Sequence, residues 1–182
     1  EEGYARYLPS FDKDKNTAYA YLAGGCFWGM ERYLGKLKGV KATNVGYIGG
    51  DKDVANYNEV KTGLTGHAEA VEVIYDPSIL SYRELIKYFF RIHDPTTLNR
   101  QKNDIGTQYR SAIFTNNESE IQTVKDIIKK IDSSKYFSDP VTTKIEPISI
   151  FGNAEEYHQD YLKKNPNGYD CHLLNPKELP FE

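Results

Sequence analysis

The sequence predicts an α+β fold, namely a two-layer sandwich with a mixed sheet, a ferredoxin-like (split βαβ) core, long loops and a C-terminal coil. Segments with strand-like and helix-like patterns follow one another in the order strand, helix, strand, strand, helix, strand, helix, strand. The chain has 182 residues, of which 39% are hydrophobic and 27% charged, as is typical of one globular domain. We therefore expect a single domain over residues 1–182, with an N-terminal arm at 1–16 and the coil at 165–182.

In the N-terminal half, β-forming residues dominate or alternate in three segments that are expected to be strands: 17–23, 40–47 and 67–75. The segment 26–37 carries apolar residues every three or four positions, which predicts a helix. Gly24 and Gly25 form the turn between the first strand and this helix, so Cys26 is expected at the helix start. A long polar connection containing Tyr57 precedes the third strand.

In the C-terminal half, Ser81 and Glu84 have the spacing of a capping box, and the apolar stripe that follows predicts a helix ending near His93. The polar segment 96–107 has no periodicity and is longer than most connections, a kind of loop that often carries function. The remaining elements are expected in this order: a strand at 110–115, a helix capped by Asn116 or Asn117, extended segments within 141–150, and a helix at 154–162.

The composition argues against two classes of partner. A formal net charge of -3 offers no basic patch of the kind that binds nucleic acid. No apolar run approaches the ~20 residues that cross a bilayer, and residues 1–10 lack the basic start and apolar centre of a signal peptide. We expect a cytoplasmic monomer that binds neither nucleic acid nor membrane, although export or fusion to a further domain stays open.

Cys26 is the first candidate for chemistry. The chain has only two cysteines, Cys26 and Cys171, too few for a scaffold held together by disulfides. A free thiol is only a few per cent thiolate at neutral pH, and the unpaired N–H groups at a helix start favour the anion. Gly24 and Gly25 leave the approach to the sulfur free of side chains. The alternative is that Cys26 is a small apolar residue filling the helix start.

Five segments of the chain resemble a known family. Gly25-Cys26-Phe27-Trp28-Gly29 reads as the GCFWG signature of the A-type peptide methionine sulfoxide reductases, a combination with Trp and Cys that rarely arises by chance. Four further matching segments follow in the family's order: 66–69 (GHAE), 93–100 (HDPTTLNR), 103–110 (NDIGTQYR) and 154–159 (AEEYHQ). The resemblance spans about Thr17 to Gly168.

The resemblance implies an enzyme that reduces the S epimer of methionine sulfoxide, free or in proteins, with Cys26 as its nucleophile. Phe27 and Trp28 are expected to form an apolar pocket for the substrate methyl group, since aromatic rings make favourable contacts with methyl and sulfur groups. Phe27 is also a candidate for an ordinary core aromatic. Two phenol donors to the sulfoxide oxygen and a supporting carboxylate are carried over from the family: Tyr57, Tyr109 and Asp104.

Glu69 is the candidate general acid, because the oxygen of a sulfoxide leaves badly unless it is protonated. This residue interrupts a mostly apolar strand, where a buried carboxyl tends to keep its proton. The alternative, in which Glu69 and Glu72 are surface charges on a solvated strand face, would be preferred without the GHAE match.

Cys171 is the only candidate to resolve the sulfenic acid on Cys26 as a disulfide. It lies in the terminal coil after Asn165-Pro-Asn-Gly168. In the family's commonest form a cysteine directly follows the NPNGY stretch, whereas Asp170 intervenes here. The chain has no third cysteine to relay the disulfide, so a thioredoxin-like dithiol is expected to reduce it directly, without a resident cofactor or metal.

Two alternatives of other classes stay open. The first is a cysteine hydrolase or acyl-transfer enzyme in which His67 or His158 activates Cys26. The second is a zinc-stabilised interaction domain, whose ligands would be Cys26, Cys171, His158 and His172. The lack of any CxxC pair makes this second reading poor.

Overall fold

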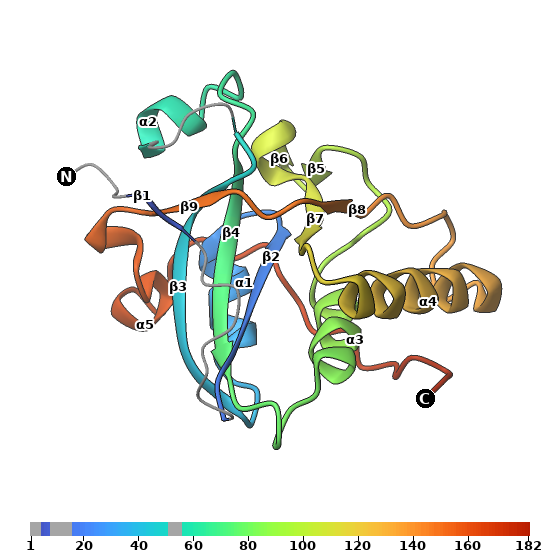
Figure 1. Ribbon diagram of the computed structural model, residues 1–182. Coiled ribbons are helices and arrows are strands. Elements are labelled where there is room, and N and C mark those ends of the chain that lie inside the picture. Colours follow the sequence, from blue (N-terminus) through green and yellow to red (C-terminus); the bar gives the residue numbers. More distant parts are fainter. Residues whose placement is uncertain (1–4, 8–15, 51–55) are drawn as a thin grey trace.

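The computed structural model of the chain describes residues 5–7, 16–50 and 56–182 (Figure 1). Its strands are β1 (Ala5–Tyr7), β2 (Ala18–Gly24), β3 (Val40–Ile48), β4 (Ala68–Tyr75), β5 (Arg100–Gln101), β6 (Asp104–Ile105), β7 (Ser111–Phe114), β8 (Lys144–Glu146) and β9 (Ile150–Asn153). Its α-helices are α1 (Phe27–Leu34), α2 (Tyr57–Val60), α3 (Tyr82–Ile92), α4 (Glu118–Ser134) and α5 (Tyr161–Lys164). Two short 3-10 helices are η1 (Thr107–Tyr109) and η2 (Glu156–His158).

Seven strands form one mixed sheet in the order β1-β9-β3-β4-β2-β7-β8, and β5 pairs with β6 separately. Neighbouring strands are antiparallel except β7 and β8, which are parallel. At the centre of the sheet, Val71 of β4 pairs with Leu22 of β2 on one side and with Val45 of β3 on the other. The predicted α+β class with a mixed sheet is confirmed.

Both faces of the sheet are buried. Successive side chains of a strand point to opposite sides, so one strand contributes to a hydrophobic cluster on each face. Leu22 belongs to the larger hydrophobic cluster, which also includes buried residues of α1, α3 and α4. Its neighbours Tyr21 and Ala23 belong to a smaller cluster with Phe114 and Phe151. The sheet thus supports α1 on the side of the larger cluster.

Helix α1 is shorter than the predicted segment 26–37, because it ends at Leu34. The N–H of Gly35 donates to Glu31 O at 2.9 Å and closes the helix. Leu37 still packs against the larger cluster. The apolar spacing therefore continued beyond the last helical residue, which made the predicted helix too long.

The predicted starts of two helices are confirmed by their caps. The Ser81 hydroxyl accepts from the N–H of Glu84 at 3.1 Å at the start of α3. The Asn117 side chain accepts from the N–H of Glu120 at 3.1 Å at the start of α4, which decides between Asn116 and Asn117.

The prediction of one helix at 154–162 is wrong, since η2 and α5 are separated at Gln159 and Asp160. Asp160 has a φ of 52°, which a continuous right-handed helix does not allow. The Gln159 amide bonds both backbone groups of Val45 at 2.9 Å, and the Asp160 N–H donates to Glu31 at 2.8 Å. These tertiary hydrogen bonds outweigh local helix propensity.

Three loops contain short elements that the sequence did not predict. The expected arm at 1–16 includes β1, whose backbone pairs with β9 and covers that edge. The connection before β4 falls partly on residues 51–55, outside the described residues, and its described part contains α2. The loop at 96–107 carries the β5–β6 hairpin.

The C-terminal coil is held along α3 (Figure 1). The N–H of Asn175 donates to Arg91 O at 2.8 Å, and Lys87 Nζ donates to Phe181 O at 2.7 Å. Leu179 is buried in the larger cluster. The coil therefore follows a defined course that brings residues 169–172 to the start of α1.

Candidate active site

A small cavity of about 80 Å³ lies at the N-terminal end of α1. Seven of the eight residues predicted from the sequence line it: Cys26, Phe27, Trp28, Tyr57, Glu69, Asp104 and Tyr109. Tyr169 is the eighth lining residue and was not predicted. Five separate segments of the chain meet here, so the cavity exists only in the folded protein.

Cys26 is the residue that precedes α1, and it is 7% exposed. The preceding Gly25 has a φ of 95°, and a Cβ there would come within 2.6 Å of the Gln101 side chain. Glycine is therefore required for the tight turn that delivers Cys26 to the cavity.

Burial raises the pKa of the Cys26 thiol, and Glu69 raises it further, whereas the Trp28 N–H lowers it. The helix start thus favours the thiolate as expected, through the Trp28 N–H, but this effect is not large enough to produce the thiolate. Desolvation of the anion outweighs the N–H groups of one short helix. The thiol keeps its proton at neutral pH and must lose it during the reaction.

Glu69 lies in β4 and is 2% exposed. Its Oε1 accepts from the N–H of Phe27 at 3.1 Å. Burial raises its pKa to about 8, the Phe27 N–H opposes this, and Asp104 raises it again. The carboxyl is therefore mostly protonated at neutral pH and can deliver a proton into the cavity. Its burial rules out the alternative of a solvated strand face.

The two aromatic residues after Cys26 differ in their surroundings. Phe27 is 1% exposed and belongs to the larger hydrophobic cluster. Trp28 is half-buried, stacks on Tyr161 with ring centroids 3.8 Å apart, and donates from Nε1 to His158 Nδ1 at 3.0 Å. The indole is thus held from two directions and forms a fixed apolar wall.

Tyr57 and Tyr109 reach the cavity from α2 and η1. Burial raises the pKa of both phenols, and Glu69 raises it further. Both groups therefore stay protonated and can donate hydrogen bonds to an oxygen in the cavity.

Glu155 positions Tyr57 and was not predicted as a site residue. It is 6% exposed, and its Oε2 accepts from the N–H of Tyr57 at 3.2 Å. Its Oε1 accepts from the hydroxyl of Tyr47 at 2.9 Å. The segment 154–159 that carries the family resemblance contains this residue, which was the available signal.

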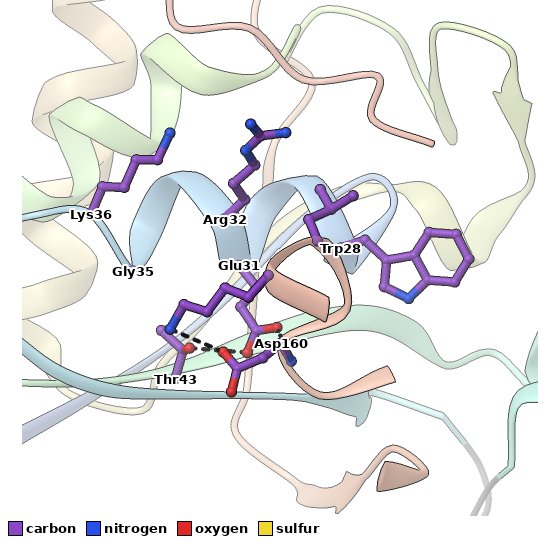
Figure 2. Close-up of a pocket in the computed structure, with 9 residues that line it drawn as sticks. Trp28, Glu31, Arg32, Gly35, Lys36, Thr43 and Asp160 are labelled. Atoms are coloured by element: carbon purple, nitrogen blue, oxygen red, sulfur yellow. Dashed lines mark hydrogen bonds and ion pairs between the residues drawn. The ribbon is translucent and has the colours of Figure 1, made fainter. Parts of the chain in front are cut away.

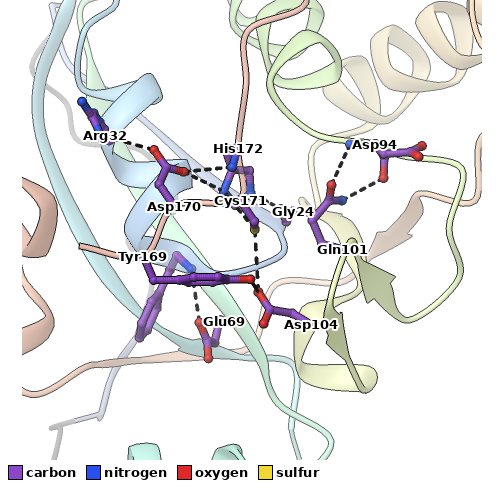
Figure 3. Close-up of polar contacts among 11 residues, drawn as sticks. Gly24, Arg32, Glu69, Asp94, Gln101, Asp104, Tyr169, Asp170, Cys171 and His172 are labelled. Atoms are coloured by element: carbon purple, nitrogen blue, oxygen red, sulfur yellow. Dashed lines mark hydrogen bonds and ion pairs between the residues drawn. The ribbon is translucent and has the colours of Figure 1, made fainter. Parts of the chain in front are cut away.

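The terminal coil closes another side of the site (Figure 3). The Tyr169 hydroxyl donates to Asp104 Oδ2 at 3.2 Å, and Cys171 Sγ lies 3.7 Å from the same oxygen. Cys26 and Cys171 are both free thiols. Asp104 thus connects the cavity to Cys171, although Cys171 itself is not among the lining residues.

A family model described as "Peptide methionine sulfoxide reductase" matches residues 18–181 of the chain. The chain belongs to this family. It is 46% identical over 166 residues to the peptide methionine sulfoxide reductase MsrA of Pseudomonas fluorescens, covering 91% of this chain and 78% of the relative.

Two solved structures of Mxr1 from Saccharomyces cerevisiae are also similar. The reduced form superposes with a TM-score of 0.82 at 39% identity and covers 94% of this chain and 96% of that chain. Mxr1 in complex with Trx2 superposes with a TM-score of 0.58 at 27% identity, covering 93% of this chain and 94% of that chain.

A second cavity, of about 180 Å³, is also lined by Trp28 in this member of the reductase family (Figure 2). Glu31, which is 5% exposed, accepts from the Thr43 hydroxyl at 3.0 Å and from the Asp160 N–H at 2.8 Å. Burial raises its pKa to about 7. Glu31 thus ties α1 to the residue before α5, which places Tyr161 against Trp28.

The surroundings of His158 argue against its part in the hydrolase alternative. His158 Nδ1 accepts from Trp28, and burial lowers the pKa of this histidine to about 4, so it is a poor base for Cys26. Among the described residues, no group of three or more His, Cys, Asp or Glu side chains is arranged to hold a metal ion. No helix within the described ranges is long and apolar enough to span a membrane.

Proposed function

We propose that this chain reduces the S epimer of methionine sulfoxide, free or in proteins, to methionine. The observation that carries the proposal is the shared cavity of Cys26 and Glu69, in which a buried carboxyl holds its proton beside the only thiol that lines it. Membership of the reductase family supports the same reaction.

In the first step, the sulfur of Cys26 takes the oxygen of the sulfoxide. Glu69 gives its proton to the sulfoxide oxygen and takes up the proton of the thiol, so no net charge builds up in the buried site. Tyr57 and Tyr109 donate hydrogen bonds to the same oxygen while its charge changes. The products are methionine and a sulfenic acid on Cys26.

In the second step, Cys171 attacks the sulfenic sulfur, which forms the Cys26–Cys171 disulfide and releases water. The 3.7 Å contact between Cys171 Sγ and Asp104 supports this role, because Asp104 also lines the cavity. A thioredoxin-type dithiol then reduces the disulfide. The solved complex of the relative Mxr1 with Trx2 supports such a partner. Electrons come from this external dithiol, and no resident cofactor is part of the proposal.

The organisation of the chain is proposed on similar grounds. The match over residues 18–181 supports one A-type reductase domain over residues 1–182. The strand order β3-β4-β2-β7, with α1 and α3 as the connections after β2 and β4, supports a two-layer split βαβ core. The monomeric state and the cytoplasmic compartment stay predictions.

An assay with separated epimers tests the function. The purified chain is incubated with dithiothreitol and either the S or the R epimer of methionine sulfoxide, and methionine is measured. We expect the S epimer alone to be consumed. Consumption of the R epimer, or no methionine from either, would contradict the proposal.

A further inference from the structure

His172 binds the turn that precedes Cys26 (Figure 3). Its side chain is 0% exposed, and its Nε2 lies 2.7 Å from the carbonyl oxygen of Gly24. Its backbone N–H donates to Asp170 Oδ1 at 2.9 Å. The residue next to Cys171 is therefore anchored two positions before Cys26.

The Gly24 carbonyl determines which ring nitrogen of His172 carries hydrogen. A carbonyl oxygen can only accept, so Nε2 must be the protonated nitrogen. Nδ1 then faces two groups at once, because it lies 3.7 Å from Cys171 Sγ and 3.7 Å from Asp170 Oδ1. In the neutral ring, this nitrogen has a free lone pair beside the thiol.

Gly29 of α1 provides the space for this arrangement. A Cβ at Gly29 would overlap both His172 Nδ1 and Asp170 Oδ1. Neither atom could stay in place beside a larger residue. The last glycine of the GCFWG segment thus permits close packing of the coil on α1.

The surroundings of Nδ1 favour transfer of the thiol proton onto the ring. Burial lowers the pKa of His172, but hydrogen bonds with Asp170 and Cys171 outweigh burial and raise the pKa to about 9. Arg32 in turn lies 3.4 Å from Asp170 Oδ2 and holds that carboxylate in place. The imidazolium that forms when the thiol proton moves onto Nδ1 is therefore stabilised directly beside the sulfur of Cys171.

We propose that His172 is a positioning residue for the second step: it takes the proton of the Cys171 thiol and holds the thiolate for attack on Cys26. This inference rests on the proposed function. Transfer of the thiol proton to Nδ1 leaves a thiolate next to an imidazolium. The thiolate attacks the sulfenic sulfur, so an S–S bond forms while the S–O bond breaks. The departing oxygen takes the proton of Glu69 and leaves as water, and His172 and Glu69 restore their protons through solvent.

Several charged or titratable groups face this pair. They come from the coil, α1, β4, β6 and the end of α3: Tyr169, Asp170, Cys26, Arg32, Glu69, Asp104 and His93. Asp104 opposes the thiolate from the other side of the sulfur, at 3.7 Å. Burial lowers the pKa of His93 to about 3, so this ring adds no charge at neutral pH. The His172 cation is thus the group that offsets Asp104.

The first test separates the two chemical steps. Reduced wild-type chain and His172→Gln are mixed with one equivalent of methionine S-sulfoxide without reductant and quenched at intervals. Methionine, dimedone-trapped sulfenic acid and disulfide are measured. In His172→Gln we expect methionine at the wild-type rate but disulfide at least about tenfold slower, because only a few per cent of an ordinary thiol is ionised. His93→Gln, which also removes a buried histidine, serves as the matched control and should resolve normally.

The second test distinguishes proton transfer from mere positioning of the coil. The rate of Cys171 alkylation by iodoacetamide is measured against pH in two proteins that both carry Cys26→Ser, one with His172 in place as the reference and one with His172→Gln. We expect slower alkylation at neutral pH and a midpoint at higher pH in His172→Gln, because the imidazole that takes up the thiol proton is gone. An unchanged midpoint, even with slower disulfide formation, would overturn the proposal, and so would disulfide formation at the wild-type rate.

Asp170→Asn keeps the test decisive if His172→Gln fails to fold. It removes the carboxylate beside Nδ1 and should shift the alkylation midpoint in the same direction by a smaller amount; no shift would overturn the proposal. If wild-type chain formed no methionine, the proposed function would fail instead, which the methionine measurement shows separately.

Discussion

The backbone N–H of Phe27 donates to Glu69 Oε1 at 3.1 Å, so a buried carboxyl binds the first turn of the helix that Cys26 begins. A helix start favours a carboxylate. Burial nevertheless has a larger effect than the helix start and raises the pKa of Glu69 to about 8. This balance keeps a proton beside the nucleophile at neutral pH, and it carries a cost in stability.

The cost should be measurable from the pH dependence of unfolding. Glu69 has a pKa of about 8 in the folded chain and an ordinary value of 4.5 in the unfolded chain. The contribution of its proton to the stability of the folded state is therefore fully present below pH 4.5. That stability is lost as the pH rises through about 8, because the folded chain binds the extra proton. Glu69→Gln should therefore reduce the fall in the free energy of unfolding between pH 5 and 8 by roughly 2–5 kcal/mol. Urea unfolding at several pH values measures this free energy, and Glu84→Gln, at an exposed position, is the control. If the free energy of unfolding of Glu69→Gln fell with pH as steeply as that of wild type, the raised pKa of Glu69 would be contradicted.

The rate of the first step should follow the same titration. Methionine formation in a single turnover is expected to fall as the pH rises through about 8, because Glu69 then loses the proton it donates. Glu69→Gln should be about tenfold to a hundredfold slower at pH 7 and lack this decline. Some activity should persist, since the amide and the tyrosines still donate hydrogen bonds. An unimpaired profile in the variant would argue against the acid role.

Substitution of each of the two cysteines should block a different step of the reaction. Cys26→Ser is expected to form no methionine, because a hydroxyl cannot take the sulfoxide oxygen. Cys171→Ser should form one methionine per chain and then stop, with no turnover driven by thioredoxin. Quenched-flow detection of methionine distinguishes the two. Substantial activity in Cys26→Ser would show that the nucleophile is another residue.

Tyr57 and Tyr109 should both donate hydrogen bonds to the oxygen of the substrate. Tyr57→Phe and Tyr109→Phe are each expected to lower kcat about tenfold, and the double variant by more, because each removes a donor to the charged oxygen of the transition state. Tyr33→Phe, in the last turn of α1 and outside the cavity lining, is a control for loss of a hydroxyl and should stay near wild type. Two single variants with wild-type kcat would refute the donor role.

The wall formed by Trp28 depends on Tyr161. Tyr161→Ala removes the ring that stacks on Trp28 at 3.8 Å and should raise KM about threefold to tenfold with little change in kcat, given the ~0.5–1.5 kcal/mol of an aromatic pair. Tyr161→Phe keeps the stack and should behave as wild type. Steady-state kinetics with dithiothreitol measure both; equal KM values for the Ala and Phe variants would show that the stack is not needed.

Local patterns predicted most of the sheet and the helices that pack on it. The alternation in β4, the cap at Ser81 and the apolar spacing of α3 depend on neighbours within a few positions, which the sequence displays directly. The break at Asp160 could not be predicted in this way, because it depends on Glu31, more than a hundred positions earlier.

The sequence by itself determined the order of the main strands and helices, the family and seven of the eight residues that line the cavity, because short-range periodicity and motifs such as the GCFWG segment are properties of neighbouring residues. Only the tertiary structure decided the protonation states of Glu69 and Cys26 and the contact between Cys171 and His172. Burial of Glu69 and Cys26, and the contact of His172 with Gly24, arise when distant segments exclude water together, and desolvation then outweighs what each local motif favours.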